Sequence, residues 1–227
     1  MPMVPAFGWQ ELAEVIAAVG GLGTAAVGLV DATKAFGGGV SNRGWATLAA
    51  GLRLYGPAFR QSIGEGWEEV FKSGWLNGRS RADQLVMARN FIRLGLSEAT
   101  AEEIARVSVV DPARLKAVAR KITSGLELTP AEFELVGRMD AGVEARLGAA
   151  YDRAEQRYRN TARVAAGAVA VLLALAGWAL VLGADLNYLG LALLAGATAV
   201  PVAPLVKDLV SSLSASAQAM KALKAIP

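Results

Sequence analysis

The sequence predicts an all-α integral membrane protein with three transmembrane helices and a helical cytoplasmic domain. Residues 164–183 carry no charge, residues 186–206 carry none either, and only Ala184 and Asp185 separate the two stretches. Two adjacent uncharged stretches of about 20 residues are what two membrane-crossing helices joined by a tight turn require. No segment shows the alternating pattern of β-branched residues that is typical of strands.

Residues 1–39 are expected to contain the first transmembrane helix, over about residues 9–36, followed by a glycine hinge. The uncharged core of this helix, residues 15–30, is rich in small residues, and the triple glycine at 37–39 ends the helix. Because the uncharged run is only 16 residues long, a buried or interfacial hairpin helix is the alternative interpretation.

Residues 40–129 form a different region, with dense charge and the start signals of short helices. Ser80 with Asp83 fits a capping box, and Asp111 provides an N-cap before a proline at the first helical position. Gly125 can end the helix that starts there. We therefore expect four or five short helices in a cytoplasmic domain.

A single long helix is predicted from Pro130 to about residue 182. Thr129 provides its N-cap, the proline fits the first helical position, and Glu132 completes the start signal. Residues 130–163 would form a cytosolic stalk with an apolar stripe that Asp140 interrupts. The same helix would then continue as a membrane span.

The transmembrane hairpin is expected over residues 164–207, and an amphipathic C-terminal helix over residues 208–227. Pro201 and Pro204 lie near the end of the third span and should kink it. Beyond the hairpin, apolar residues recur with spacings of four and three, which suits packing on the stalk or on a neighbouring subunit.

Basic residues are distributed unequally across the predicted boundaries. Residues 1–33 contain no Lys or Arg, and the turn between the second and third spans carries only Asp185. Four arginines precede the second span and three lysines follow the third. Under the positive-inside rule, the N-terminus faces out, and residues 40–163 and the C-terminus are cytoplasmic.

Composition restricts the chemistry that is available. The 227 residues contain no cysteine and no histidine, which excludes disulfides, thiol nucleophiles, zinc fingers and imidazole bases. The acidic cluster Glu65, Glu68 and Glu69 is expected to be a solvated helix face rather than a metal site. We therefore expect no catalytic residue, no cofactor and no metal. The net charge of +3 suits lipid headgroups better than nucleic acid.

Two sets of residues are candidates for functional surfaces. Small residues at helical spacing let helices approach closely in lipid, either within one subunit or between copies in a homo-oligomer. These packing or oligomer residues are Gly20, Gly21, Thr24, Gly28, Ala166, Ala170, Ala174, Ala192, Gly196, Leu209, Leu213 and Met220. Aromatic and basic residues suit the membrane interface, although the aromatic ones could instead fill a soluble core. The interface set is Trp45, Trp67, Trp75, Arg159, Arg163 and Lys207.

Several short sequence segments, spread over most of the chain, are similar to those of known proteins. They are Phe7-Gly8-Trp9, Gly28-Leu29-Val30-Asp31-Ala32, Gly37-Gly38-Gly39-Val40-Ser41-Asn42, Tyr158-Arg159-Asn160 and Val200-Pro201-Val202-Ala203-Pro204-Leu205-Val206-Lys207-Asp208-Leu209. Together they resemble a family of small, uncharacterised bacterial integral membrane proteins. The resemblance implies a bacterial inner-membrane setting and assigns no activity or site.

These features favour a non-enzymatic, homo-oligomeric protein of the bacterial inner membrane that serves as a scaffold or assembly platform. One alternative is a homo-oligomeric channel lined by Thr24, Thr198 or the glycines. The other is an accessory subunit of a larger membrane complex, with the helices of residues 97–125 binding a different protein. An enzyme is the least favoured class.

Overall fold

The computed structural model describes residues 9–224, and within them the side chains of residues 13–208, 211 and 212. It is all-helical, at 84% helix, and the described residues contain no strand, which confirms the predicted all-α class. The chain divides into two compact units. Unit 1 comprises Met1–Val40 with Asn160–Pro227, and unit 2 comprises Ser41–Arg159.

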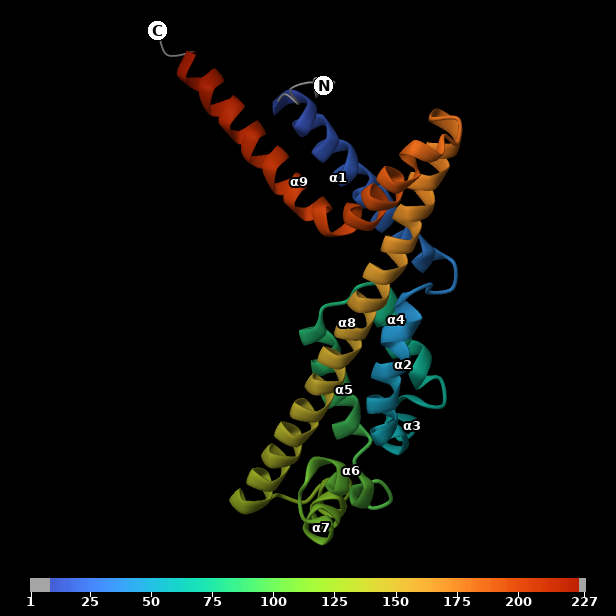
Figure 1. The fold of residues 1–227 in the computed structure, drawn as a ribbon. Helices are drawn as coiled ribbons and strands as arrows, with labels where there is room; N and C mark the ends of the chain where they lie inside the picture. The colour runs from blue at the N-terminus through green and yellow to red at the C-terminus, as the bar shows by residue number, and fades with distance from the viewer. Residues whose placement is uncertain (1–8, 225–227) are drawn as a thin grey trace, which may run out of the picture. The chain divides into compact units, whose positions relative to one another are not determined.

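Unit 2 is a bundle of short helices around the first part of a long one (Figure 1). The described part of residues 40–129 contains six α-helices, where the sequence predicts four or five, because the chain turns at Gly64 and at a 3₁₀ turn over Arg53–Tyr55. The helices are α2 (Ser41–Leu52), α3 (Gly56–Ile63), α4 (Trp67–Leu76), α5 (Arg81–Leu94), α6 (Ala101–Ser108) and α7 (Pro112–Thr123).

The predicted N-caps are present in unit 2. The Ser80 side chain accepts a hydrogen bond from the backbone N–H of Asp83, and Asp111 accepts one from Arg114, at 2.7 Å. At the start of α8 (Pro130–Val181), the backbone N–H of Thr129 donates to the Glu132 carboxylate at 2.8 Å, and the Thr129 hydroxyl accepts from the Glu132 N–H. Each cap satisfies a donor that the first turn leaves without a partner.

The Glu132 cap should make the stability of the protein pH-dependent. A hydrogen bond from Lys121, and then one from the backbone of Thr129, lower the pKa of Glu132 from 4.5 to about 2. A lowered pKa stabilises the fold above the unfolded value and loses that effect as pH falls through the folded value. Glu132→Gln should therefore lower Tm at pH 7, and the difference from wild type should shrink between pH 4.5 and about 2.

Thermal melts of the full chain across this pH range test the cap. Glu127→Gln, at an exposed position just before the cap, is the control and should melt like wild type at every pH. A Tm difference for Glu132→Gln that stays constant down to pH 2 would contradict the proposed charge effect.

The first part of α8 is a core element of unit 2. Met139, Val143, Leu147 and Tyr151 are buried along one face of it, in the same cluster as side chains from α2 to α7. The sequence predicts a separate stalk over residues 130–163, whereas the structure includes α8 up to Arg159 in the helical unit. The long helix itself is confirmed, because α8 is continuous from Pro130 to Val181.

Asp140 interrupts the apolar face of α8 because it has a partner on α5. Its carboxylate accepts two hydrogen bonds from the guanidinium of Arg93, and only 11% of its side chain is exposed. The charge-assisted pairing satisfies an acid that would otherwise be buried without a partner. The pair also raises the pKa of Arg93, chiefly through the hydrogen bond to Asp140.

Unit 1 contains the apolar helices. They are α1 (Trp9–Ala32), the last part of α8, and α9 (Leu189–Lys224), with short 3₁₀ turns at Thr33–Ala35 and Leu186–Tyr188. Between α8 and α9, Gly183 and Ala184 adopt positive φ, and the Asp185 side chain accepts a hydrogen bond from the N–H of Asn187. This is the tight turn that the uncharged stretches predict.

Helix α9 runs without a break from Leu189 to Lys224 but changes direction partway along its length (Figure 1). Pro201 and Pro204 lie inside it. A proline in a helix interior removes a backbone donor and its ring pushes against the preceding turn, so a bend is the expected result.

Candidate functional site

The candidate site is the apolar surface of unit 1. Three helical stretches are long and apolar enough to cross a membrane, one in each of α1, α8 and α9. Only 11% of the most apolar window of α8 is buried, and the value for α9 is the same. Large side chains such as Leu172, Leu180 and Leu191 are more than half exposed. Helices that are apolar on every side and not covered by protein suggest association with a membrane.

The faces on which these helices pack are made of small residues. A Cβ on Gly23 would lie 2.1 Å from the carbonyl oxygen of Ala199, and one on Gly20 would lie 2.4 Å from a methyl group of Val206. A Cβ on Gly196 would lie 2.6 Å from the Cα of Val171 in α8. Only glycine permits such close approach of the backbones, as in the small-residue packing of membrane helices.

The packing row of α1 differs from the predicted row. Gly20, Gly23, Ala26 and Val30 are buried, with spacings of three, three and four. The row predicted from the sequence instead joins Gly20 to Thr24 and Gly28 by a strict spacing of four. A straight helix has 3.6 residues per turn, so a row that follows one face must mix spacings of three and four. Gly23 and Ala26 were therefore missed.

The predicted α1 residues that are not in the packing row form an exposed surface. Gly21 and Gly28 are both exposed, and a Cβ added to either would have no other atom within 4 Å. Thr24 is also exposed, and its hydroxyl donates to the carbonyl of Gly20 at 2.9 Å. One face of α1 thus packs within the subunit, while a second face with small residues stays open.

The predicted alanines of α8 and α9 divide in a similar way. Ala166 and Ala170 are buried, and Ala170 lies in one cluster with Ala26 and Ala199. Ala174 and Ala192 are half-buried. Leu209, Leu213 and Met220 belong to α9, but their side chains lie outside the described residues.

The predicted aromatic interface is instead part of the core of unit 2. Trp67 is 4% exposed, and its ring lies 5.1 Å from that of Phe59. Trp45 is buried as well. Trp75 is half-buried, and its indole N–H donates to the carbonyl of Ser41 at 3.1 Å. The structure therefore favours the alternative, a soluble-type core, over a lipid-facing collar.

The basic residues of the predicted interface are exposed. Arg159 pairs with Glu155 one turn earlier at 2.8 Å, while Arg163 and Lys207 lie at the surface of unit 1. Their positions at the polar ends of the uncharged stretches suit contact with headgroups.

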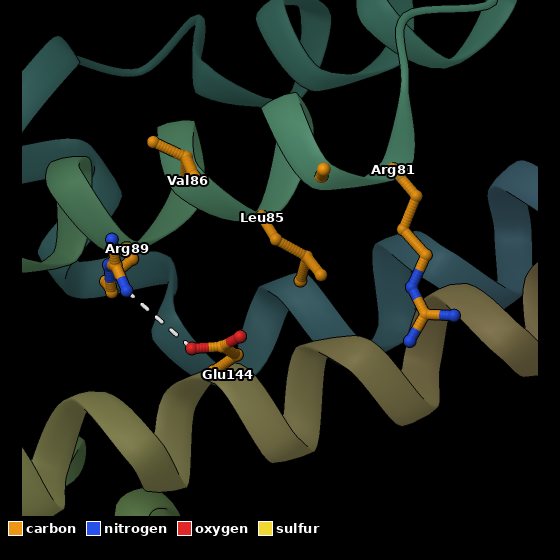
Figure 2. A pocket seen from close by; sticks show the side chains of 6 residues that line it. Arg81, Leu85, Val86, Arg89 and Glu144 are labelled. Atoms are coloured by element: carbon orange, nitrogen blue, oxygen red, sulfur yellow. Dashed lines mark ion pairs between the residues drawn. The ribbon is translucent and has the colours of Figure 1, made fainter.

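A surface hollow of about 240 Å³ lies between α5 and α8 in unit 2 (Figure 2). Leu85 and Val86 line it, and Arg89 faces Glu144 across it, with 3.6 Å between the charged atoms. Arg81, at its other end, pairs with Asp152. Each arginine already faces a carboxylate, so the hollow is a seam of ion pairs between two helices and offers little spare charge to a ligand.

Acidic residues in the described part of the chain form no group that could hold a metal ion. Glu68 of the predicted acidic cluster pairs with Arg53 through two hydrogen bonds, of 2.9 and 3.0 Å. The hydrogen bond from Arg53 lowers the pKa of Glu68. A carboxylate held in its charged form by an arginine is a structural ion pair and a weak general acid.

Comparison of the chain with protein-family models, with curated proteins and with solved structures returned no match. The structure itself defines the class of protein. It is all-helical, with one compact helical unit and three apolar helices, each long enough to cross a membrane.

Proposed function

We propose that the protein is a non-enzymatic scaffold of the bacterial inner membrane, built from several copies of this chain. The observation that supports this most strongly is the continuity of α8. Its first part supplies core residues of unit 2, and its last part is apolar and exposed. One helix thus contributes both to a folded domain and to an apolar stretch that suits a bilayer.

The charge distribution supports a cytoplasmic position for unit 2. Arginines precede the apolar part of α8, Lys207 follows the apolar part of α9, and the turn between them carries one acid, Asp185. Under the positive-inside rule, a hairpin with this bias inserts from the cytoplasmic side. The resemblance to small bacterial membrane proteins is consistent with this setting.

The open face of α1 supports assembly of several copies. Gly20 and Gly23 pack within the subunit, so Gly21 and Gly28 remain for a contact between copies. In lipid, such small-residue faces permit close helix pairs. A scaffold needs this kind of surface, and it needs no catalytic group.

A channel is the second candidate, but the threonine hydroxyls proposed to line it already donate hydrogen bonds within their own helices. The hydroxyl of Thr198 donates to the carbonyl of Leu194 at 2.8 Å, and that of Thr24 is satisfied in the same way by its own helix. Hydroxyls bonded within their helix present less polar surface to a water-filled path. An accessory subunit, docked through α6 and α7, is the third candidate.

Native mass spectrometry of protein extracted gently from its own membranes tests the scaffold. We expect one defined homo-oligomer for the wild type and a shift to smaller assemblies for Gly21→Leu, because a larger side chain separates the two copies. Gly137→Leu, at an open position on α8 in unit 2, is the matched control and should leave the assembly unchanged. A wild-type monomer would reject the scaffold, and a heteromeric mass would favour the accessory subunit.

A further inference from the structure

The turn that joins α8 to α9 carries a cluster of large, exposed apolar side chains. Leu180 and Leu186 are 86% and 76% exposed, and Val181 and Tyr188 are exposed as well. Asp185 is the only charged residue between positions 164 and 206. Turns that face water are rich in polar residues and have backbone groups that water can satisfy. The apolar surface of this turn indicates that something other than water covers it.

Polar groups of the turn are satisfied within the turn itself. The indole N–H of Trp178 donates to the carbonyl of Asp185 at 2.7 Å, and the Asp185 carboxylate accepts from the backbone N–H of Asn187 at 3.0 Å. Further backbone N–H groups donate to carbonyls of the same segment, namely those of Leu182, Ala184, Asp185 and Tyr188. These bonds reduce the number of donors that need water, which is the condition for backbone in contact with lipid.

The two aromatic residues beside the turn have the character of residues at the edge of a bilayer. Trp178 is half-buried near the end of α8, and its N–H points to the turn. Tyr188 follows the turn and is exposed. Trp and Tyr are enriched at membrane–water interfaces, because each has an apolar ring with one polar group. The interface residues expected from the sequence did not include these two.

The length of α8 limits how far the turn can reach. In the proposed membrane location, the exposed Arg163 stays at the polar edge of the bilayer, because a charge in the hydrocarbon core is costly. From Arg163 to Val181, where α8 ends, the helix rises about 27 Å at about 1.5 Å per residue, whereas the hydrocarbon core is about 30 Å thick. A helix that starts at one edge of the core therefore ends at the other edge and does not project the turn into water.

Resting on the proposed membrane location, we infer that the α8–α9 turn is embedded in the interfacial layer of the bilayer and is covered by lipid. Asp185 then lies among the headgroups, and Trp178 and Tyr188 lie at the boundary of the hydrocarbon core. The exposed leucines of the turn contact acyl chains. The turn presents no docking surface to a soluble protein.

A second copy of the chain suits this surface less well than lipid does. Close contacts between copies in a membrane depend on small residues, which let the backbones approach. The exposed residues of the turn are large, as Leu180 and Leu186 show. The open small-residue face lies on α1, at Gly21 and Gly28. The two surfaces therefore have different partners, lipid for the turn and another copy for α1.

Single reporter cysteines can measure the depth of the turn, because the chain has no native cysteine. Leu186→Cys places a label on the turn, Leu172→Cys places one within the apolar part of α8, and Ala113→Cys places one on α7 in unit 2. All three positions are exposed. Each full-length variant is labelled with the environment-sensitive fluorophore NBD and reconstituted in vesicles of phosphatidylcholine and phosphatidylglycerol. The vesicles carry a nitroxide quencher either near the headgroup or near the end of the acyl chain.

We expect the Leu186→Cys label to emit at a shorter wavelength than in water and to lose more fluorescence to the shallow quencher than to the deep one. The Leu172→Cys label should show the opposite preference, because that residue lies near the middle of the uncharged stretch. The Ala113→Cys label should emit as in water and keep its fluorescence with both quenchers.

A Leu186→Cys label that neither quencher reaches, while the Leu172→Cys label is quenched, would overturn the inference and leave the membrane location intact. Water-like emission would then mean that the turn projects into solution, and a blue-shifted emission would mean that protein covers it. Equal quenching of the Leu186→Cys and Ala113→Cys labels, or stronger quenching of Leu186→Cys by the deep quencher, would overturn it too. Absence of quenching at both Leu172→Cys and Leu186→Cys would instead reject the membrane location itself, so the two failures are distinguishable.

Discussion

Leu172→Arg should remove most of the protein from the membrane. Leu172 lies near the middle of the uncharged stretch of α8 and is 64% exposed. If that surface faces lipid, replacing leucine by arginine at the helix centre costs about 3 kcal/mol in membrane insertion. If the surface faced water, the same change would be neutral or would improve solubility. We expect a strong loss of the membrane-bound fraction, measured by fractionation and immunoblotting.

Leu94→Arg is the matched control for this experiment. Leu94 ends α5 in unit 2 and is 72% exposed, so both leucines are similarly open in the structure. Only Leu172 lies in a stretch that we place in lipid. Equal membrane fractions for the two variants would show that exposure of Leu172 has no relation to a bilayer.

Gly95→Ala should be among the most destabilising single changes in unit 2. A Cβ at this position would lie 2.0 Å from the carbonyl oxygen of Ala58 and 2.9 Å from its Cα. Both groups belong to the backbone, so the chain itself must move to admit one methyl group. Overpacking of this kind costs about 3 kcal/mol, and more where the neighbours are rigid. The expected result is a large drop in Tm of the full chain in detergent.

Gly137→Ala isolates the effect of the contact from the effect of the residue type. Gly137 is inside α8, is exposed, and would place its Cβ in open space. Alanine there should stabilise the helix by about 0.5–1 kcal/mol, because glycine loses more chain entropy on folding. A similar loss of stability in both variants would mean that Gly95 does not touch Ala58.

Local signals predicted the helices well. Thr129, Pro130 and Glu132 form the cap that their spacing indicates, and the absence of proline up to Pro201 matches a continuous α8. The tight turn at Gly183 and Ala184 follows from the same reasoning. These features depend on neighbours within a few residues, which the sequence displays directly.

Tertiary partners were harder to predict. Asp140 interrupts an apolar stripe, and nothing near it in the sequence indicates Arg93, which lies 47 residues away. Trp67 lies among basic and acidic residues, as an interfacial tryptophan would, but in the structure it packs on Phe59. Composition alone does not distinguish a lipid surface from a protein core, because both accept the same side chains.

The packing face of α1 required a finer distinction than spacing allowed. Gly20, Gly21, Gly23 and Gly28 all have the small size that close packing needs, yet only Gly20 and Gly23 contact α9.

Alkaline carbonate extraction of membranes that contain the wild-type chain tests the membrane location most directly. Carbonate removes proteins held by charge and leaves those embedded in the hydrocarbon core. We predict that the protein stays with the membrane pellet, because α8 and α9 expose apolar surfaces long enough to be embedded in lipid. Recovery of the protein in the supernatant would contradict this location.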